Sequence, residues 1–185
     1  TSIRAHNTNK TALPRQMDAI KQWLQRGAPT SSSDADEDLG SDLCFLIGFP
    51  RSGTTLLDVM LDGHSHVLSL EEKPTIERIA FMLDQMPGHY PDAMAALTRE
   101  QRHMLRNKYR ESIASYRTLE HTLVIDKMPI RTIHTSFMHR LFPKAKFLFA
   151  ERHPCEVVLR NFMQHDANNE AMIHFTQRKS TVETY

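Results

Sequence analysis

Four short, largely apolar runs divide the sequence, and each has the length of a β-strand. The runs cover Leu43–Ile47, Val67–Leu70, Leu123–Ile125 and Lys146–Ala150. The first is wholly apolar, which is typical of a strand that is buried on both faces. Segments with a helical spacing of apolar residues lie between the runs. This alternation predicts an α/β fold in which a mostly parallel sheet is covered by helices on both faces.

The helices are predicted from apolar residues that recur three and four positions apart. One helix is expected to start at Thr54, directly after the first run, and to end near Asp62. Thr98 and Gln101 have the spacing of a capping box at the start of another helix, whose basic residues are expected to face solvent. Further helices are expected over residues 13–26, 74–85 and 131–141, and from Pro154 onward.

The composition suits one folded domain with a short extension. The sequence has 185 residues, close to the size of a single domain. Residues 1–26 are interpreted as an N-terminal helical extension and residues 27–42 as a flexible linker that is rich in serine and acidic residues. The main domain is expected over residues 43–185. After Gln164 the sequence is mostly polar and the pattern thins out.

Charge and cysteine content restrict the possible partners and compartment. A net charge of +1 gives no electrostatic reason to expect nucleic acid or an anionic membrane surface as a partner. No run reaches transmembrane length, and the sequence does not open with an apolar signal segment. Cys44 and Cys155 lack the spacing of a disulfide or a metal site. A cytoplasmic location is expected, although a targeting segment upstream stays open, as does the oligomeric state.

The stretch between the first strand and the first helix has the pattern of a phosphate-binding loop. Gly48 to Thr55, GFPRSGTT, fits G-x-x-x-x-G-K-[ST] except that Thr54 replaces the lysine. Backbone N–H groups and the helix dipole converge on an anion in such a loop. The missing lysine normally reaches the β- and γ-phosphates of a nucleoside triphosphate. We therefore expect a different phosphorylated ligand, with Arg51 supplying the positive charge.

The segment PRSGTTLL resembles the loop of sulfotransferases that use 3′-phosphoadenosine-5′-phosphosulfate (PAPS), in particular tyrosylprotein sulfotransferases and bacterial sulfotransferases associated with tetratricopeptide repeats. The resemblance runs from about Leu43 to Gln164. Family members continue to a segment with glycine and lysine that covers the nucleotide, and this sequence shows no such segment, so the resemblance implies a domain with an incomplete C-terminal part. The resemblance also implies a sulfotransferase-like fold of the P-loop type, PAPS as the sulfuryl donor, and metal-free in-line transfer to an acceptor hydroxyl. The residues that it assigns to the 5′-phosphosulfate are Arg51, Ser52, Gly53, Thr54 and Thr55.

Three further blocks extend the resemblance. Glu72, in the pair Glu71-Glu72, falls on the position proposed for the catalytic base, and Lys127, in D-K-x-P, falls on the lysine that supports the bridging oxygen. Arg152 matches the arginine of the 3′-phosphate motif. The family has a serine eight residues later, where this sequence has Arg160; a longer, charged side chain changes the geometry there.

Several alternatives stay open. His64 and His153 are alternative bases, because other sulfotransferase branches use histidine. A nucleotide kinase of the P-loop type would need a magnesium-binding aspartate, for which Asp126 is the candidate. A nucleotide-binding module without catalytic activity is the third reading. The acceptor could be a protein tyrosine, a carbohydrate or a small alcohol.

Overall fold

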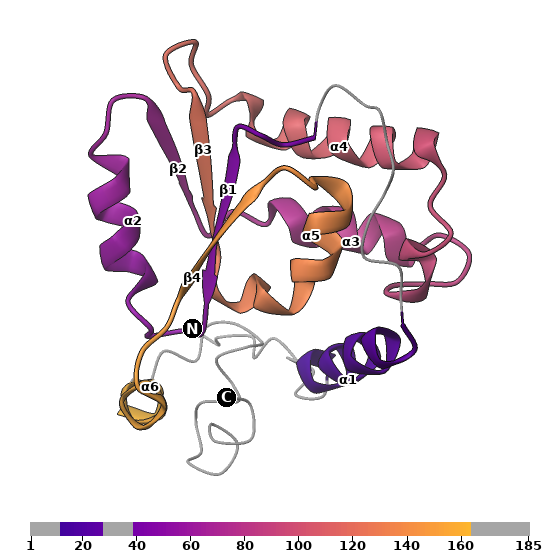
Figure 1. The fold of residues 1–185 in the computed structure, drawn as a ribbon, viewed down its shortest axis with the longest axis horizontal. Helices are drawn as coiled ribbons and strands as arrows, with labels where there is room; N and C mark the ends of the chain where they lie inside the picture. The colour runs from indigo at the N-terminus through magenta and orange to yellow at the C-terminus, as the bar shows by residue number, and fades with distance from the viewer. Residues whose placement is uncertain (1–11, 28–38, 164–185) are drawn as a thin grey trace, which may run out of the picture.

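The computed structural model describes residues 12–27 and 39–163. In this part of the chain, four parallel strands form one sheet in the order β2-β3-β1-β4 (Figure 1). The strands are β1 (Leu43–Gly48), β2 (Val67–Glu71), β3 (Leu123–Lys127) and β4 (Lys146–Ala150). The predicted α/β class and all four predicted strands are confirmed. Predictions for residues 1–11, 28–38 and 164–185 lie outside the described residues.

The helices follow the predicted pattern with one exception. They are α1 (Ala12–Gln25), α2 (Thr54–Asp62), α3 (Thr75–Asp84), α4 (Arg99–Ala114), α5 (Thr135–Leu141) and α6 (Pro154–Met163), with short 3₁₀ helices η1 (Asp92–Met94) and η2 (Pro129–His134). The capping box at the start of α4 is confirmed, since Thr98 and Gln101 exchange side chain-to-backbone hydrogen bonds of 2.9 and 3.2 Å. The single helix predicted over 131–141 is wrong. Its first part is the tighter η2, where the Thr132 hydroxyl is anchored to the Gly48 carbonyl.

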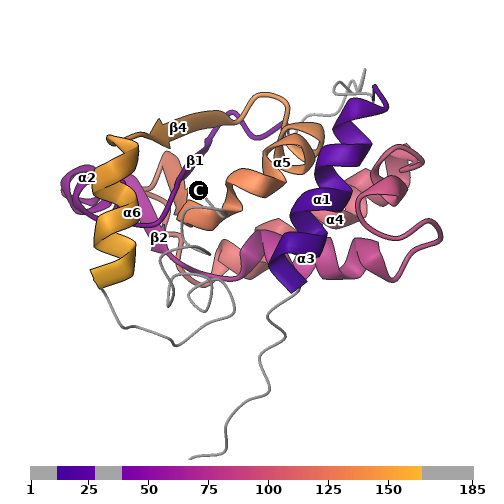
Figure 2. The same cartoon turned by 90° about the horizontal axis from the view of Figure 1, so that it is seen from below.

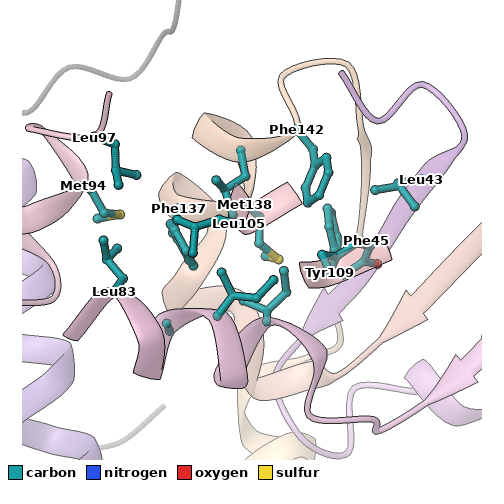
Figure 3. Close-up of a cluster of buried hydrophobic side chains, with 14 of the residues drawn as sticks. Leu43, Phe45, Leu83, Met94, Leu97, Leu105, Tyr109, Phe137, Met138 and Phe142 are labelled. Carbon is teal, nitrogen blue, oxygen red and sulfur yellow. The ribbon is translucent and has the colours of Figure 1, made fainter. Parts of the chain in front are cut away.

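Helices cover both faces of the sheet. Helix α2 lies on one face, and α3, α4 and α5 lie on the other (Figures 1 and 2). Alternate residues of β1 serve the two sides, because side chains point to opposite faces along a strand. Leu43, Phe45 and Ile47 enter the larger core, part of which is drawn in Figure 3, whereas Cys44 and Leu46 enter a smaller cluster beneath α2. None of the helices in the described ranges is long and apolar enough to cross a membrane.

Residues ahead of β1 also pack on the domain. Trp23 of α1 is 3% exposed and belongs to the larger core cluster. The guanidinium of Arg26 binds the Asp92 carboxylate at 2.6 Å. At the end of the predicted linker, Asp42 binds the guanidinium groups of Arg110 and Arg117 at 2.7 and 2.5 Å. These contacts tie α1 and the approach to β1 to the rest of the fold.

The expectation that the basic residues of α4 all face solvent is wrong for Arg106. Its side chain is fully buried, and its Nε donates to the Leu141 carbonyl at 2.6 Å. This carbonyl is at the C-terminal end of α5, where the last carbonyl groups of a helix lack partners within the helix. A buried arginine can therefore satisfy the end of a neighbouring helix while its aliphatic part packs in the core.

Candidate active site

The loop between β1 and α2 is held in a conformation that requires glycine at two positions. A Cβ atom on Gly48 would lie 2.6 Å from the Ala150 carbonyl oxygen and 2.9 Å from the Ser52 Oγ. Gly53, the N-cap of α2, has a φ of 101°, a left-handed conformation that disfavours residues with a Cβ. Within the described chain, no side chain caps the start of α2. The first N–H groups of this helix are therefore open to an anionic ligand.

Ser52 carries a buried hydroxyl without a protein partner. The residue is 8% exposed, and its Oγ makes no hydrogen bond within the described chain. Buried polar atoms almost always have a partner, so an orphan hydroxyl in a loop of this kind indicates a site that a ligand completes. Thr54, in the first turn of α2, is also buried.

The loop, the segment between β4 and α6, and α6 itself contribute residues to one cavity of about 180 Å³, which we call the anion pocket. Its lining residues are Arg51, Gly53, Thr54, Thr55, Arg152 and Arg160. The carboxylate of Glu156 binds Arg160 at 2.8 Å and Arg152 at 3.5 Å. The Arg152 guanidinium also donates to the Arg51 carbonyl at 3.5 Å. The structure thus brings together the loop and both arginines that the sequence placed in the donor site.

Lys127 and Glu72 form an ion pair at the ends of the adjacent strands β3 and β2. The Lys127 side chain is fully buried, and its Nζ lies 3.0 Å from a Glu72 carboxylate oxygen and 3.2 Å from one of Glu71. Successive side chains of a strand normally point to opposite faces. Glu72 departs from this rule because its φ is 50°, and its N–H donates to the Lys127 carbonyl at 2.9 Å. Two consecutive carboxylates can therefore reach one ammonium group.

Sequence reasoning missed a buried acid beside this pair. Asp58 of α2 is 5% exposed and accepts a hydrogen bond from the Ser69 hydroxyl of β2. Burial raises the pKa of Asp58, an effect that this hydrogen bond and the positive charge of Lys127 only partly oppose. The signal was an acidic residue in the helical face that packs on the sheet, between Leu57 and Leu61.

The two histidines considered as bases are exposed. The Nδ1 of His64 accepts from the His66 N–H at 3.2 Å, and the two rings lie 5.7 Å apart. His153 lies at the start of α6, where its carbonyl accepts from the Glu156 N–H at 3.0 Å. Neither of these contacts connects a histidine to Lys127 or to the loop.

Asp126 occupies the opposite face of the sheet from Lys127. It is fully buried, and Thr75, Tyr109 and Arg131 donate to its two oxygens at 2.6, 2.9 and 2.6 Å. Both oxygens are thus engaged within the protein. The magnesium-binding role that a kinase would require of Asp126 has no support in this geometry.

Comparison with known proteins places the chain in a family. The sequence model of the sulfotransferase family matches residues 44–185. The chain is 30% identical to human protein-tyrosine sulfotransferase 1 over 154 residues, which is 80% of this chain and 41% of that protein. It is 32% identical to the protein-tyrosine sulfotransferase of Drosophila melanogaster over 118 residues, which is 60% of this chain and 23% of that protein.

A crystal structure of a sulfotransferase from Mycobacterium avium is similar to this chain with a TM-score of 0.41 and 16% identity, over 82% of this chain and 52% of that one. The chain spans less than half the length of the two protein-tyrosine sulfotransferases. Since the family match extends over most of the sequence, from residue 44 to residue 185, the chain belongs to the sulfotransferase family.

Proposed function

We propose that this chain transfers a sulfuryl group from PAPS to an acceptor hydroxyl. The observation that carries the proposal is the anion pocket, in which a glycine-rich loop, an open helix N-terminus and three arginines converge. The sulfotransferase family and the resemblance of the loop to PAPS-binding loops support the choice of donor.

The residues present fit such a donor. Arg51, Ser52, Gly53, Thr54 and Thr55 would hold the 5′-phosphosulfate through backbone N–H groups, hydroxyls and one guanidinium. The orphan hydroxyl of Ser52 would gain its missing partner there. Arg152 and Arg160 would bind the 3′-phosphate, and Glu156 holds both guanidinium groups at the pocket. An arginine replaces the serine of the family at position 160 and can bind phosphate as a charged donor.

Lys127 and Glu72 supply the remaining chemistry in this proposal. Sulfuryl transfer, like phosphoryl transfer, requires an aligned nucleophile and stabilisation of the leaving group. The Lys127 ammonium would offset the negative charge that develops on the bridging oxygen. Glu72 would accept the proton of the acceptor hydroxyl. Its carboxylate lies 3.0 Å from the Lys127 ammonium. These steps call for no metal ion.

The first test is calorimetric titration with the product nucleotide 3′-phosphoadenosine-5′-phosphate (PAP). We expect binding without added metal, weakened about 10- to 100-fold by Arg51→Ala, because hydrogen bonds to charged groups contribute about 1.5–3 kcal/mol. Arg78→Ala is the matched control, since Arg78 is an exposed arginine on α3. Binding of magnesium-ATP in place of PAP would favour a kinase and contradict the proposal.

The second test separates the two carboxylates that contact Lys127. Glu72→Gln should lower the rate of transfer from ³⁵S-labelled PAPS by about 10²- to 10⁴-fold, the usual contribution of a general base. Glu71→Gln removes an equivalent contact to the same ammonium and should lower the transfer rate clearly less than Glu72→Gln does. Equal losses in the two variants would remove the distinction on which the role of Glu72 depends. PAP binding without transfer to any acceptor would indicate a nucleotide-binding module.

A further inference from the structure

An apolar groove of about 780 Å³ lies between α1 and α3, apart from the anion pocket. Leu13 and Ala19 of α1, Ala80 and Phe81 of α3, and Ile130 and Ile133 of η2 provide its apolar walls. Of the helices α3 and α4, α3 lies nearer to α1, as the two views together show (Figures 1 and 2). Helix α1 precedes residue 44, where the family match begins, so one wall of the groove comes from a part of the chain that the family match does not include.

The groove leads toward the donor site. Ile130 and Ile133 also line a second cavity of about 270 Å³, whose other walls include Ser52 and Arg152. Arg152 in turn lines the anion pocket. Three neighbouring spaces therefore follow one another along the edge of the sheet where β1, β3 and β4 end. Met128, the residue after Lys127 at the end of β3, also lines the groove.

Two of the polar groups that line the groove, Glu77 and His134, have partners inside the protein. The Glu77 carboxylate accepts two hydrogen bonds of 2.9 Å from the Arg131 guanidinium. His134 is bonded to the Tyr90 hydroxyl at 2.7 Å, and burial lowers the pKa of His134 to about 4, so its ring is neutral at pH 7. A cavity of this size with apolar walls and few fixed polar groups is typical of a small-molecule site.

The charges around the groove do not suit an acidic ligand. Glu77 and Asp84 bring two carboxylates to its wall, and Arg15 is the exposed cation on the side of α1. The guanidinium of Arg131 is fully buried and already paired with Glu77 and Asp126. An anionic body placed here would lose its water and meet like charge, which is costly. An uncharged apolar body would pay neither this desolvation cost nor this repulsion.

We infer that this groove binds the acceptor, and that the acceptor is an uncharged hydroxyl compound with an extended apolar body. This inference rests on the proposed function, because the hydroxyl must reach Glu72 and the donor. Helix α1 then helps to select the acceptor, through Leu13 and Ala19.

The test uses two probes of equal length, 4-pentylphenol and 5-(4-hydroxyphenyl)pentanoate, which differ by a terminal carboxylate. Equilibrium dialysis measures the binding of each probe to the chain, with and without saturating PAP. We expect 4-pentylphenol to bind at least about tenfold more tightly, a difference of about 1.4 kcal/mol. The inference would be overturned if the acidic probe binds as tightly as 4-pentylphenol or more tightly.

Two variants on opposite walls locate the binding. Ala19→Trp would fill the groove from α1, and Phe81→Glu would place a charge at an exposed position of α3. Each should weaken 4-pentylphenol binding about tenfold or more and leave PAP affinity unchanged. Ala114→Trp, at an exposed position at the end of α4, is the matched control and should change neither.

The outcomes separate the inference from the proposed function. The inference alone would be overturned if PAP binds but 4-pentylphenol does not, or if neither groove variant changes the binding of 4-pentylphenol. The first of these results would also be seen if another part of the protein or a second copy of the chain filled the groove. Failure of PAP to bind would contradict the proposed function, while 4-pentylphenol binding without PAP would still report on the groove.

Discussion

Asp126 and Lys127 are neighbours in β3, and both are fully buried charges, yet their surroundings differ in kind. Asp126 faces the larger core, where Thr75, Tyr109 and Arg131 donate to it from three elements. Lys127 faces α2, and its partners Glu71 and Glu72 are 64% and 53% exposed at their side chains. All hydrogen-bond partners of Asp126 are buried protein groups, and we call this network closed. The partners of Lys127 are carboxylates that reach solvent and can exchange the ammonium for water, and we call this network open.

This difference teaches how one strand serves both stability and chemistry. A buried charge with every oxygen or proton bound inside the protein holds elements together, and loss of one member leaves the others without partners. A buried ammonium paired with half-exposed carboxylates can move toward a ligand, because water can take its place beside the carboxylates. Three predictions test this contrast between the two faces.

The largest expected effect is on the closed face. Asp126→Ala should lower the free energy of unfolding by about 3–5 kcal/mol, because it leaves the Arg131 guanidinium and two hydroxyls buried with a partner missing. Denaturant titration measures this change. Glu111→Ala, which breaks an exposed ion pair with Lys108, is the control and should cost at most about 1 kcal/mol. A small effect of Asp126→Ala would mean that the closed network does not stabilise the fold.

On the open face, Lys127→Met should act on turnover more than on stability. We expect sulfuryl transfer to fall about 10²- to 10³-fold, the usual cost of removing one preorganised group that stabilises charge in a transition state. The free energy of unfolding should change by about 1 kcal/mol or less, because the carboxylates of Glu71 and Glu72 are exposed to solvent once the ammonium is removed. Lys108→Met is the control on α4. A large loss of stability with normal transfer per folded molecule would reverse the contrast.

The smallest expected effect concerns Asp58, which lies on the same face as Lys127. Burial raises the pKa of Asp58 in the folded protein, so the native state binds this proton more readily than the unfolded chain. Protonation of Asp58 therefore adds to the free energy of unfolding at low pH, and this contribution is lost as the pH rises through the pKa of Asp58 in the folded protein. Asp58→Asn keeps an acceptor for Ser69 and should be more stable than the wild type above that pKa.

Denaturation of both proteins at pH 4 and pH 8 checks this prediction. The advantage of Asp58→Asn should be larger at pH 8. An equal difference at both pH values would show that Asp58 does not titrate differently on folding.

The part of the fold that could be predicted from the sequence is the part set by local patterns. The stretch from Leu43 to Thr55 contains an apolar strand, a loop with two glycines and the start of an amphipathic helix, and each is encoded within a few residues. The capping box of α4 is local in the same sense. The helix over 131–141 failed because Thr132 and Arg131 bond to groups far away in the sequence, Gly48 and Glu77.

The candidate site shows the same division. Residues in recognisable blocks, from Arg51 to Arg160, could be named in advance, and the structure brings the loop, Arg152 and Arg160 to one pocket. Their roles in binding and catalysis stay predictions. Asp58 and Ser69 were missed because their contact joins a helix to a strand and neither residue belongs to a motif. The groove was missed because its walls come from three elements that only the fold brings together.

The packing of α1 on the core has a practical consequence for spectroscopy. Trp23 is the single tryptophan of the sequence, and its indole is buried in the larger core cluster. Fluorescence excited at the indole band therefore reports on this one helix without any label. An emission maximum at short wavelength would indicate that α1 is docked, and a red shift on adding a compound or a variant would indicate its release. The helix that forms one wall of the groove thus carries its own optical reporter.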